Sequence, residues 1–396
     1  MQPLPPSPSR TQNMTREQMI DRARALAPRF AERAAAAEEA RQIPPESVKE
    51  MLDAGLTRIL LPQRIGGYGL GFDTWFDVTR ELSKTDASHG WCAGLFIHHA
   101  HLIAQYPAEA QMAVWAENVD VPISASFAPS VKATPVDGGY RISGAGSSFA
   151  SGVDHCSWVM LGGMAQDGPT PEWKFFLVPP GKYKVSDTWF TAGMRATGSK
   201  TIVTDNVFVP HGRVLRLTDL RDGTGPGAIH SGIIFRTPFF YYAPISFVTP
   251  MLGAVQGAYE VFREWTKTRK TQDGKSVAEK PAVQVRMTRA AADIDAAELL
   301  LRRAVNVTDA PEAYSPQLLA RSVRDFTRAS ELCVEAIDTL IALSGTAGFA
   351  SSHPIQRAWR DIHFMSMHIS LNVETNFTHY GRMELGLGRD ASRPYF

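Results

Sequence analysis

The segment VKATPVDGGYRISG, residues Val131–Gly144, decides how the chain is divided, because it has the pattern of a β-hairpin within a largely helical sequence. Two runs with β-branched and apolar residues flank the cluster Asp137-Gly138-Gly139, and such clusters connect antiparallel strands. Similar short runs, separated by turn residues, occur from 121 to 215. This spacing predicts a central antiparallel β-domain over 121–215.

The sequence before this β-region is dominated by residues that favour helices. Residues 15–40 are dense in Ala, Arg and Glu, with few helix breakers, and predict one long helix. Shorter helices are expected over 45–54, 72–82, 87–105 and 108–117. We therefore predict an N-terminal helical domain over 14–120, preceded by a disordered leader at 1–13.

The sequence after the β-region returns to helical periodicity. One apolar stripe, with residues alternately four and three apart, consists of Val283, Met287, Ala290, Ile294, Ala297, Leu301 and Ala304. A second stripe follows over 322–343. Long striped helices joined by short loops pack as bundles, so a C-terminal helical bundle is expected over 216–396. The predicted fold class is α+β, with two helical parts flanking a β-domain.

Composition excludes several kinds of protein. The chain has 396 residues, 44% of them hydrophobic, and a net charge of +1, which gives no basic field for nucleic acid. No apolar run approaches the roughly 18 residues that span a membrane, and the Pro- and Ser-rich N-terminus does not resemble a signal peptide. Three widely spaced cysteines argue against a disulfide framework and a zinc site. We expect a cytoplasmic protein.

The stretch HPIQRAWRDIHFMSMHISLNVETNFTHY, residues His353–Tyr380, holds an unusual density of ionisable groups among apolar positions. It contains an Arg pair, an Asp and four histidines, and it is expected to form one helix. Helices seldom carry so many such groups unless one face lines a cavity. This helix is therefore predicted to close a pocket.

Two further motifs carry a family resemblance that covers nearly the whole chain. TAGMRATGSKTIVTDNVFVP (Thr191–Pro210) and SGTAGFASSHPIQRAWRD (Ser344–Asp361) resemble segments of the acyl-CoA dehydrogenase superfamily. The resemblance implies the acyl-CoA dehydrogenase-like fold, with a C-terminal four-helix bundle. Many dehydrogenases of that family place a catalytic glutamate shortly after the Arg-Asp pair, whereas His368-Ile369 stands here.

This departure, together with Trp91 and His99 in GWCAGLFIHHA, resembles the flavin-dependent monooxygenases of the same superfamily. These are oxygenase components of two-component systems. The resemblance implies that reduced FMN or FAD arrives from a separate NAD(P)H-flavin reductase and reacts with O2 to a C4a-hydroperoxyflavin, which hydroxylates a phenol, an indole or a related ring. It also implies a homotetramer.

The resemblance assigns roles to individual residues. His368 takes the position of the base, Ser151 lies near flavin N5, and His99 frames the substrate. Further flavin contacts are expected from Trp91, Phe149, Arg195, Thr197, Ser199, Gly345, Thr346 and Gly348. The substrate pocket is expected to include Arg236, Phe239 and Tyr241. No metal is expected, because the cluster of His98, His99 and His101 has no third convergent ligand close in sequence.

Several alternatives remain open at the level of sequence. His368 as a histidine satisfied by a backbone carbonyl, Ser151 as a turn residue and the aromatic run at 239–242 as core are ordinary structural interpretations. An oxygenase acting on sulfur or nitrogen, a flavin dehydrogenase or oxidase, and a non-catalytic flavin-binding helical protein are the alternative functions.

Overall fold

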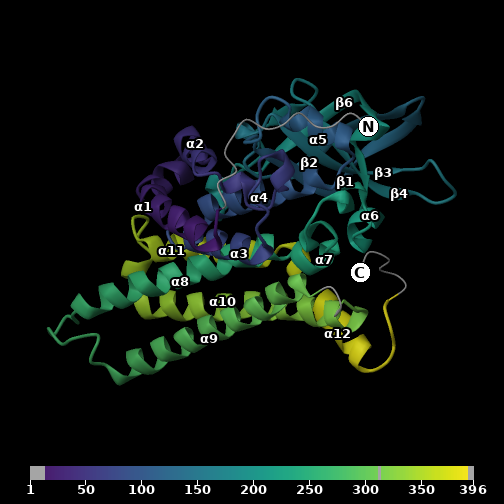
Figure 1. Ribbon diagram of the computed structural model, residues 1–396. Helices are drawn as coiled ribbons and strands as arrows, with labels where there is room; N and C mark the ends of the chain where they lie inside the picture. The colour runs from purple at the N-terminus through teal and green to yellow at the C-terminus, as the bar shows by residue number, and fades with distance from the viewer. Residues whose placement is uncertain (1–13, 311–313, 391–396) are drawn as a thin grey trace.

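The computed structural model describes residues 14–310 and 314–390, and the leader predicted at 1–13 lies outside them. The elements follow the predicted order of helices, strands and helices. In Figure 1 the sheet lies at one side of the molecule and the long helices α8 (Ile245–Thr268), α9 (Pro281–Asn306) and α10 (Pro316–Gly348) lie at the other. The domain boundaries near 120 and 215 stay predictions.

The N-terminal helices form where they were predicted. They are α1 (Arg16–Ala40), α2 (Pro45–Asp53), α3 (Phe72–Ser83), α4 (Ala87–Ala104) and α5 (Ala108–Trp115). Helix α1 begins with a capping box, in which the Thr15 side chain accepts from the Gln18 N–H and the Gln18 side chain accepts from the Thr15 N–H. Such a box satisfies two backbone donors that have no partner within the helix.

Helix α4 lies at the centre of the fold because of its composition. It contains no Lys, Arg, Asp or Glu, and nearly all of its residues are buried. A helix that is apolar on all sides needs neighbours on all sides. It contacts the sheet through β1 (Ile123–Val136) and the bundle through α8, and so connects the two parts of the molecule (Figure 1).

Seven strands form one sheet in the order β5-β6-β2-β1-β3-β4-β7. After β1 these are β2 (Gly139–Ala150), β3 (Trp158–Ala165), β4 (Glu172–Val178), β5 (Lys184–Ser186), β6 (Lys200–Pro210) and β7 (Val214–Arg216). The predicted hairpin is confirmed, because Val136 pairs with Gly139 across the turn and Gly138 has a φ of +75°. Glycine adopts this conformation at little steric cost.

The prediction of a purely antiparallel domain is wrong at one pairing. Strands β1 and β3 run parallel, whereas the other five pairings are antiparallel. Strand β6 occupies the free edge of β2, so β3 pairs with the opposite edge of β1. The chain reaches that edge through the turn η3 (Val153–His155), and the sheet is therefore mixed.

The four-helix bundle consists of α8, α9, α10 and α11 (Pro354–Ser366), and α10 contacts the other three. Both predicted stripes turn inward. Five of the seven residues of the first stripe are buried: Ala290, Ile294, Ala297, Leu301 and Ala304. Along the second stripe Val323, Phe326, Cys333, Ile337 and Ile341 are buried.

The prediction of a single helix over 353–380 is wrong. Helix α11 ends at Ser366, a short turn η10 (Ile369–Leu371) follows, and α12 (Val373–Glu384) begins a new direction. His368 is extended and its Nδ1 accepts the Ser370 N–H at 3.2 Å. Asn372 then caps α12 by accepting the Thr375 N–H at 2.8 Å. Polar side chains of this kind replace helical partners and end one helix in favour of the next.

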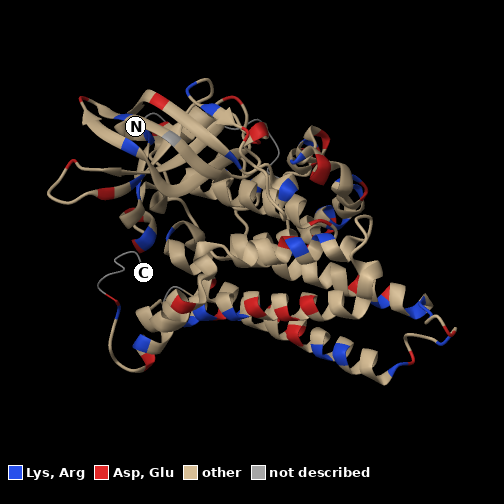
Figure 2. Ribbon diagram, turned by 180° about the vertical axis from the view of Figure 1, so that it is seen from behind, with Lys and Arg blue, Asp and Glu red and all other residues tan. Residues whose placement is uncertain are grey.

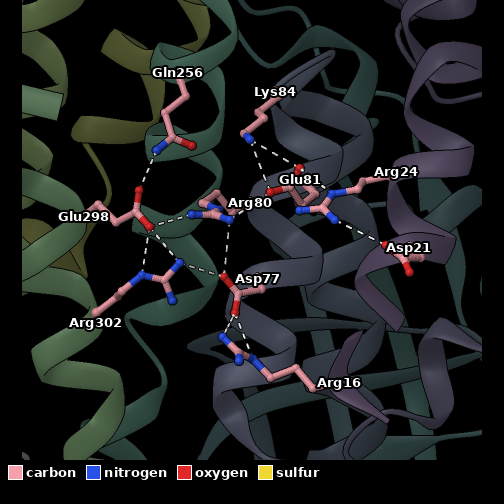
Figure 3. Close-up of polar contacts among 10 residues, drawn as sticks. All are labelled: Arg16, Asp21, Arg24, Asp77, Arg80, Glu81, Lys84, Gln256, Glu298 and Arg302. Carbon is pink, nitrogen blue, oxygen red and sulfur yellow. Dashed lines mark hydrogen bonds and ion pairs between the residues drawn. The ribbon is translucent and has the colours of Figure 1, made fainter. Parts of the chain in front are cut away.

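A buried charge network joins four helices (Figure 3). The Asp77 carboxylate on α3 is 1% exposed and contacts Arg16 of α1, Arg80 of α3 and Arg302 of α9. Glu298 of α9 accepts from Arg80 at 2.6 Å and from Gln256 of α8 at 2.8 Å. A buried carboxylate needs such partners, so this network fixes the packing of the N-terminal helices on the bundle.

Lys and Arg positions alternate with Asp and Glu positions along the helices of the ribbon in Figure 2. Among the helices of the described residues, none combines the length and the apolar character required to cross a membrane. The cysteines Cys92, Cys156 and Cys333 are buried free thiols.

Candidate functional site

Four side chains from three separate segments form a continuous hydrogen-bond chain. The indole Nε1–H of Trp91 on α4 donates to Ser151 Oγ at 3.0 Å. Ser151 Oγ lies 2.7 Å from Ser199 Oγ, which lies 2.6 Å from Thr197 Oγ1. Thr197 Oγ1 donates to the Met194 carbonyl at 2.8 Å. The structure thus brings together four of the residues for which flavin contacts were predicted.

Tight backbone turns place these hydroxyls. Phe149 and Gly152, on either side of Ser151, have φ values of +65° and +64°. The Gly152 N–H donates to the Thr197 carbonyl at 2.8 Å, which ties the loop after β2 to the loop before β6. Met194 also has a positive φ, +52°, at the start of the turn η4 (Arg195–Thr197). Positive φ is uncommon outside glycine and often marks functional turns.

His368 also lies beside Trp91. Its ring stacks on Phe247 of α8 with 3.7 Å between the centroids, and it meets the Trp91 ring edge-on at 6.4 Å. Removal from water among these rings lowers the pKa of His368 to about 4. The imidazole is therefore neutral at pH 7. Because Nδ1 accepts the Ser370 N–H, the proton of this neutral ring is on Nε2.

His99 and Phe239 lie in a buried aromatic cluster around Phe127. The centroid distances to Phe127 are 6.2 Å for His99 and 5.8 Å for Phe239. His99 Nδ1 donates to the Ile123 carbonyl at 2.7 Å, and burial lowers the pKa of His99 to about 4. The neighbouring His98 is buried as well, and its Nε2 has no partner among the described residues. This cluster is separate from the hydroxyl chain in its contacts.

The remaining predicted residues have other partners. Phe149 is 67% exposed beside Trp189, and Arg195 donates to the carbonyls of Glu38 and Thr191. Arg236 is exposed. Tyr241 donates to the Ser315 carbonyl within a small apolar cluster of its own. Gly345 has a φ of +62° near the end of α10, where Thr346 is exposed and Gly348 is buried. Their roles in binding stay predictions.

Two residues that the sequence did not single out support this site. Phe247 gives no periodic or motif signal, although it forms the face on which His368 lies. Asp361 is the aspartate of the Arg-Asp pair, and its Oδ1 accepts the Met194 N–H at 2.5 Å. Burial raises the pKa of Asp361 to about 7, and the nearby Asp86 adds to this shift. An acidic residue within an apolar stretch was the available signal for Asp361.

The chemistry of the donor set fits a neutral heteroaromatic ring edge. The hydrogen-bond chain consists of one indole N–H and three hydroxyl groups that are bonded to one another, and the nearby imidazole is uncharged at pH 7. In residues 14–310 and 314–390, no three His, Cys, Asp or Glu side chains gather as metal ligands would. An isoalloxazine ring presents N–H and carbonyl groups along one edge, which neutral donors and acceptors satisfy.

Comparison with known proteins gives consistent matches. Family models described as acyl-CoA dehydrogenase, N-terminal domain, and acyl-CoA dehydrogenase, C-terminal domain, match residues 11–119 and 245–373. The chain is 35% identical to the flavin-dependent monooxygenase oxygenase subunit HsaA of Rhodococcus jostii, over 93% of this chain and 98% of that protein. It is also 35% identical to the oxygenase component of an FADH2-dependent resorcinol hydroxylase of a Rhizobium species, over 96% and 97% of the two chains.

A solved structure agrees with these sequence matches. The crystal structure of 3-HSA hydroxylase from Rhodococcus sp. RHA1 superposes with a TM-score of 0.90 and 32% identity, over 95% of this chain and 98% of that chain. The acyl-CoA dehydrogenase-like fold expected from the sequence is therefore confirmed.

Proposed function

Because the chain belongs to the acyl-CoA dehydrogenase family and has flavin-dependent monooxygenase oxygenase subunits as relatives, we propose that it is the oxygenase component of a two-component flavin-dependent monooxygenase that hydroxylates an aromatic substrate. The observation that carries this proposal is the hydrogen-bond chain Trp91–Ser151–Ser199–Thr197, with the His368 ring 6.4 Å from the Trp91 ring between the centroids. Reduced flavin supplies two electrons to O2 when it is bound.

Ser151, Trp91, Thr197 and Ser199 would hold the flavin edge that includes N5. These groups are neutral, so they add no charge beside the ring, and Ser151 Oγ is the atom that would meet N5. Ser151, Thr197 and Ser199 are each 4% exposed or less, which keeps water from this edge. Exclusion of water suits an oxygen reaction, because proton leakage diverts reactive oxygen to hydrogen peroxide.

His368 would bind the hydroxyl or ring N–H of the substrate. In the observed geometry Nε2 carries the ring proton and donates, which recognises a phenolate oxygen. A phenolate is more electron-rich than a phenol at the ring carbon that is oxygenated. To remove a phenolic proton, Nε2 must be unprotonated, so the ring proton must be on Nδ1. In that tautomer Nδ1 can no longer accept the hydrogen bond from the Ser370 N–H. In both forms the role of His368 is to favour the anionic substrate.

The aromatic cluster of Phe127, Phe239 and His99 is proposed to form one wall of the substrate pocket, in line with the sequence prediction. The proposal further includes an NAD(P)H-flavin reductase as partner, reduced FMN or FAD as co-substrate, a homotetramer and a cytoplasmic location. The free buried thiols agree with a reducing compartment. The resorcinol hydroxylase relative is FADH2-dependent, which favours FAD over FMN.

The proposal is tested by reconstitution. The purified chain is combined with a general flavin reductase, NADH, FAD or FMN, and a panel of phenols, indoles and fused aromatic compounds. We expect hydroxylated product with at least one substrate, and 18O from labelled O2 in that product. Oxidation of NADH with hydrogen peroxide as the sole product across the panel would contradict the aromatic hydroxylase assignment.

A further inference from the structure

The hydrogen-bond chain at the site has a fixed direction, which follows from counting hydrogens. The Met194 carbonyl has no hydrogen, so Thr197 Oγ1 must donate in their 2.8 Å contact. A hydroxyl has one proton. Since the Thr197 proton is committed, Ser199 must donate to Thr197 over 2.6 Å. For the same reason Ser151 must donate to Ser199 over 2.7 Å.

The contact with Trp91 determines what hydrogen bonds the Ser151 oxygen can still form. Trp91 Nε1–H can only donate, and it does so to Ser151 Oγ at 3.0 Å. The Ser151 proton is committed to Ser199, and one of its two lone pairs is taken by Trp91. One lone pair remains. Toward any further partner, Ser151 Oγ can therefore accept a hydrogen bond but cannot donate one.

The acceptor end of the chain is held from three sides. The Met194 carbonyl also accepts from Trp189 Nε1–H at 3.0 Å and from the Thr197 N–H at 3.2 Å. The N–H of the same residue donates to the Asp361 carboxylate on α11 at 2.5 Å. Reversal of the chain would require Thr197 to leave this carbonyl inside the protein, where Thr197 is 1% exposed and water cannot readily replace the lost contact.

We propose that Thr197 and Ser199 are positioning residues that keep Ser151 Oγ an acceptor, and that this acceptor selects flavin with hydrogen on N5 over oxidised flavin. Reduced flavin has an N5–H that donates to Ser151. Oxidised flavin has a lone pair at N5, which would face the lone pair of Ser151. This inference rests on the proposed function, because that proposal places N5 beside Ser151. It supplies a reason for the chain to take up reduced flavin and to release the oxidised form.

The test measures the dissociation constants of reduced FAD under anaerobic conditions and of oxidised FAD, for wild type and three variants. Thr197→Val keeps the shape of the side chain and removes the hydroxyl, and Ser199→Ala removes the next hydroxyl. Either change frees the Ser151 proton to donate to N5 of oxidised flavin. We expect the ratio of the oxidised to the reduced dissociation constant to fall roughly fivefold to tenfold, the worth of one ordinary hydrogen bond.

The control is Thr204→Val on strand β6, which follows the loop that contains Thr197 and Ser199, since Thr204 Oγ1 is buried and has no partner among the described residues. We expect this variant to keep the wild-type ratio. The inference would be overturned if Thr197→Val and Ser199→Ala bind both flavins in the wild-type ratio. Wild type that binds neither flavin would overturn the proposed function as well, so the two failures are distinguishable.

A second probe needs no variant. 5-Deaza-FAD has a C–H in place of N5 and is stable in air, so it lacks the lone pair that faces Ser151 in oxidised FAD. We expect wild type to bind 5-deaza-FAD roughly fivefold more tightly than oxidised FAD, by the same hydrogen-bond arithmetic. Equal affinities for the two compounds would contradict an acceptor-only Ser151.

Discussion

The imidazole of His368 lies nearly flat against the phenyl ring of Phe247, with 3.7 Å between the ring centroids and 21° between the planes. The two residues come from different parts of the bundle, since Phe247 is near the start of α8 and His368 follows α11. This contact orients the ring and keeps water from one of its faces. It accounts for a histidine that is neutral at pH 7.

Replacing Phe247 should move the titration of His368. In Phe247→Ala the imidazole gains water on one face, so its pKa should rise from about 4 toward the ordinary value near 6.5. The measurement is an NMR titration of the histidine C–H signals. Phe349→Ala is the matched control, because Phe349 is 55% exposed and packs on Trp359. An unchanged His368 titration in Phe247→Ala would refute the desolvation account.

Two replacements of His368 separate its proposed roles. His368→Ala removes both the donor and the base, and hydroxylation should fall by roughly a hundredfold or more while flavin is still oxidised. His368→Asn keeps an N–H donor but cannot bind a proton. Appreciable hydroxylation in His368→Asn would favour recognition of a phenolate by a donor, and loss equal to that of His368→Ala would favour a base. Product yield per NADH measures both, and full coupling in His368→Ala would exclude either role.

Ser151→Ala should release hydrogen peroxide faster. The variant removes the acceptor for N5–H, and one hydrogen bond corresponds to roughly a fivefold to tenfold change in rate. The measurement is the decay of the oxygenated-flavin absorbance in the absence of substrate. A decay rate equal to that of wild type would place Ser151 away from N5.

The raised pKa of Asp361 should make the stability of the protein depend on pH. Its pKa is about 7 in the folded chain and near 3.8 when unfolded, so its contribution to stability is lost as pH rises from about 4 to 7. Asp361→Asn keeps an oxygen for the Met194 N–H and removes the charge. This variant should match wild type near pH 4 and exceed it at pH 8, by about 1.4 kcal/mol for each unit of pKa shift at most.

Asp361→Ala serves as the comparison, since it leaves the Met194 N–H without its acceptor. We expect it to lose about 1–3 kcal/mol of unfolding free energy at both pH values. Urea unfolding at pH 4 and pH 8 measures all three proteins. Equal stability of Asp361→Asn and wild type at both pH values would mean that Asp361 is ionised normally.

The network around Asp77 should be important for stability. Asp77→Ala leaves Arg16, Arg80 and Arg302 without their shared carboxylate (Figure 3). Since two of these arginines are about one-third exposed, we expect a loss of roughly 2–3 kcal/mol, below the full cost of an unpaired buried charge. Asp53→Ala, which breaks an exposed pair with Lys49, should cost less than about 1 kcal/mol. A similar small effect in both variants would contradict a structural role for the network.

Much of the fold could be predicted because local patterns and packing agree. The apolar stripe at 283–304 requires an α-helix and the Asp137-Gly138 cluster requires a hairpin turn, and the structure has both. The parallel pairing of β1 with β3 could not be predicted, because it depends on β6 taking the edge of β2 from 50 residues away in sequence. The break at His368 was missed because its two capping contacts are side-chain interactions, although Asn372 was a visible helix-start residue.

The candidate site also contains residues that the sequence predicted and residues that it did not. Ser151, Thr197 and Ser199 came from resemblance to family motifs, and they lie within hydrogen-bonding distance of one another. Phe247 acts through a contact across the bundle, and Asp361 through a contact from α11 to the loop before β6, and no periodicity in the sequence encodes either contact. Arg236 and Tyr241 were predicted to line the substrate pocket, and the structure places Arg236 at the surface and Tyr241 in a separate apolar cluster.

The central claim is that the residues around Trp91 bind reduced flavin and direct its reaction with O2. The most direct test is stopped-flow mixing of the chain and anaerobic reduced FAD or FMN with oxygenated buffer. We predict a long-lived absorbance band characteristic of a C4a-hydroperoxyflavin, which disappears faster in Ser151→Ala. Direct appearance of oxidised flavin at the rate seen in free solution, with either flavin and with or without aromatic substrate, would contradict the account.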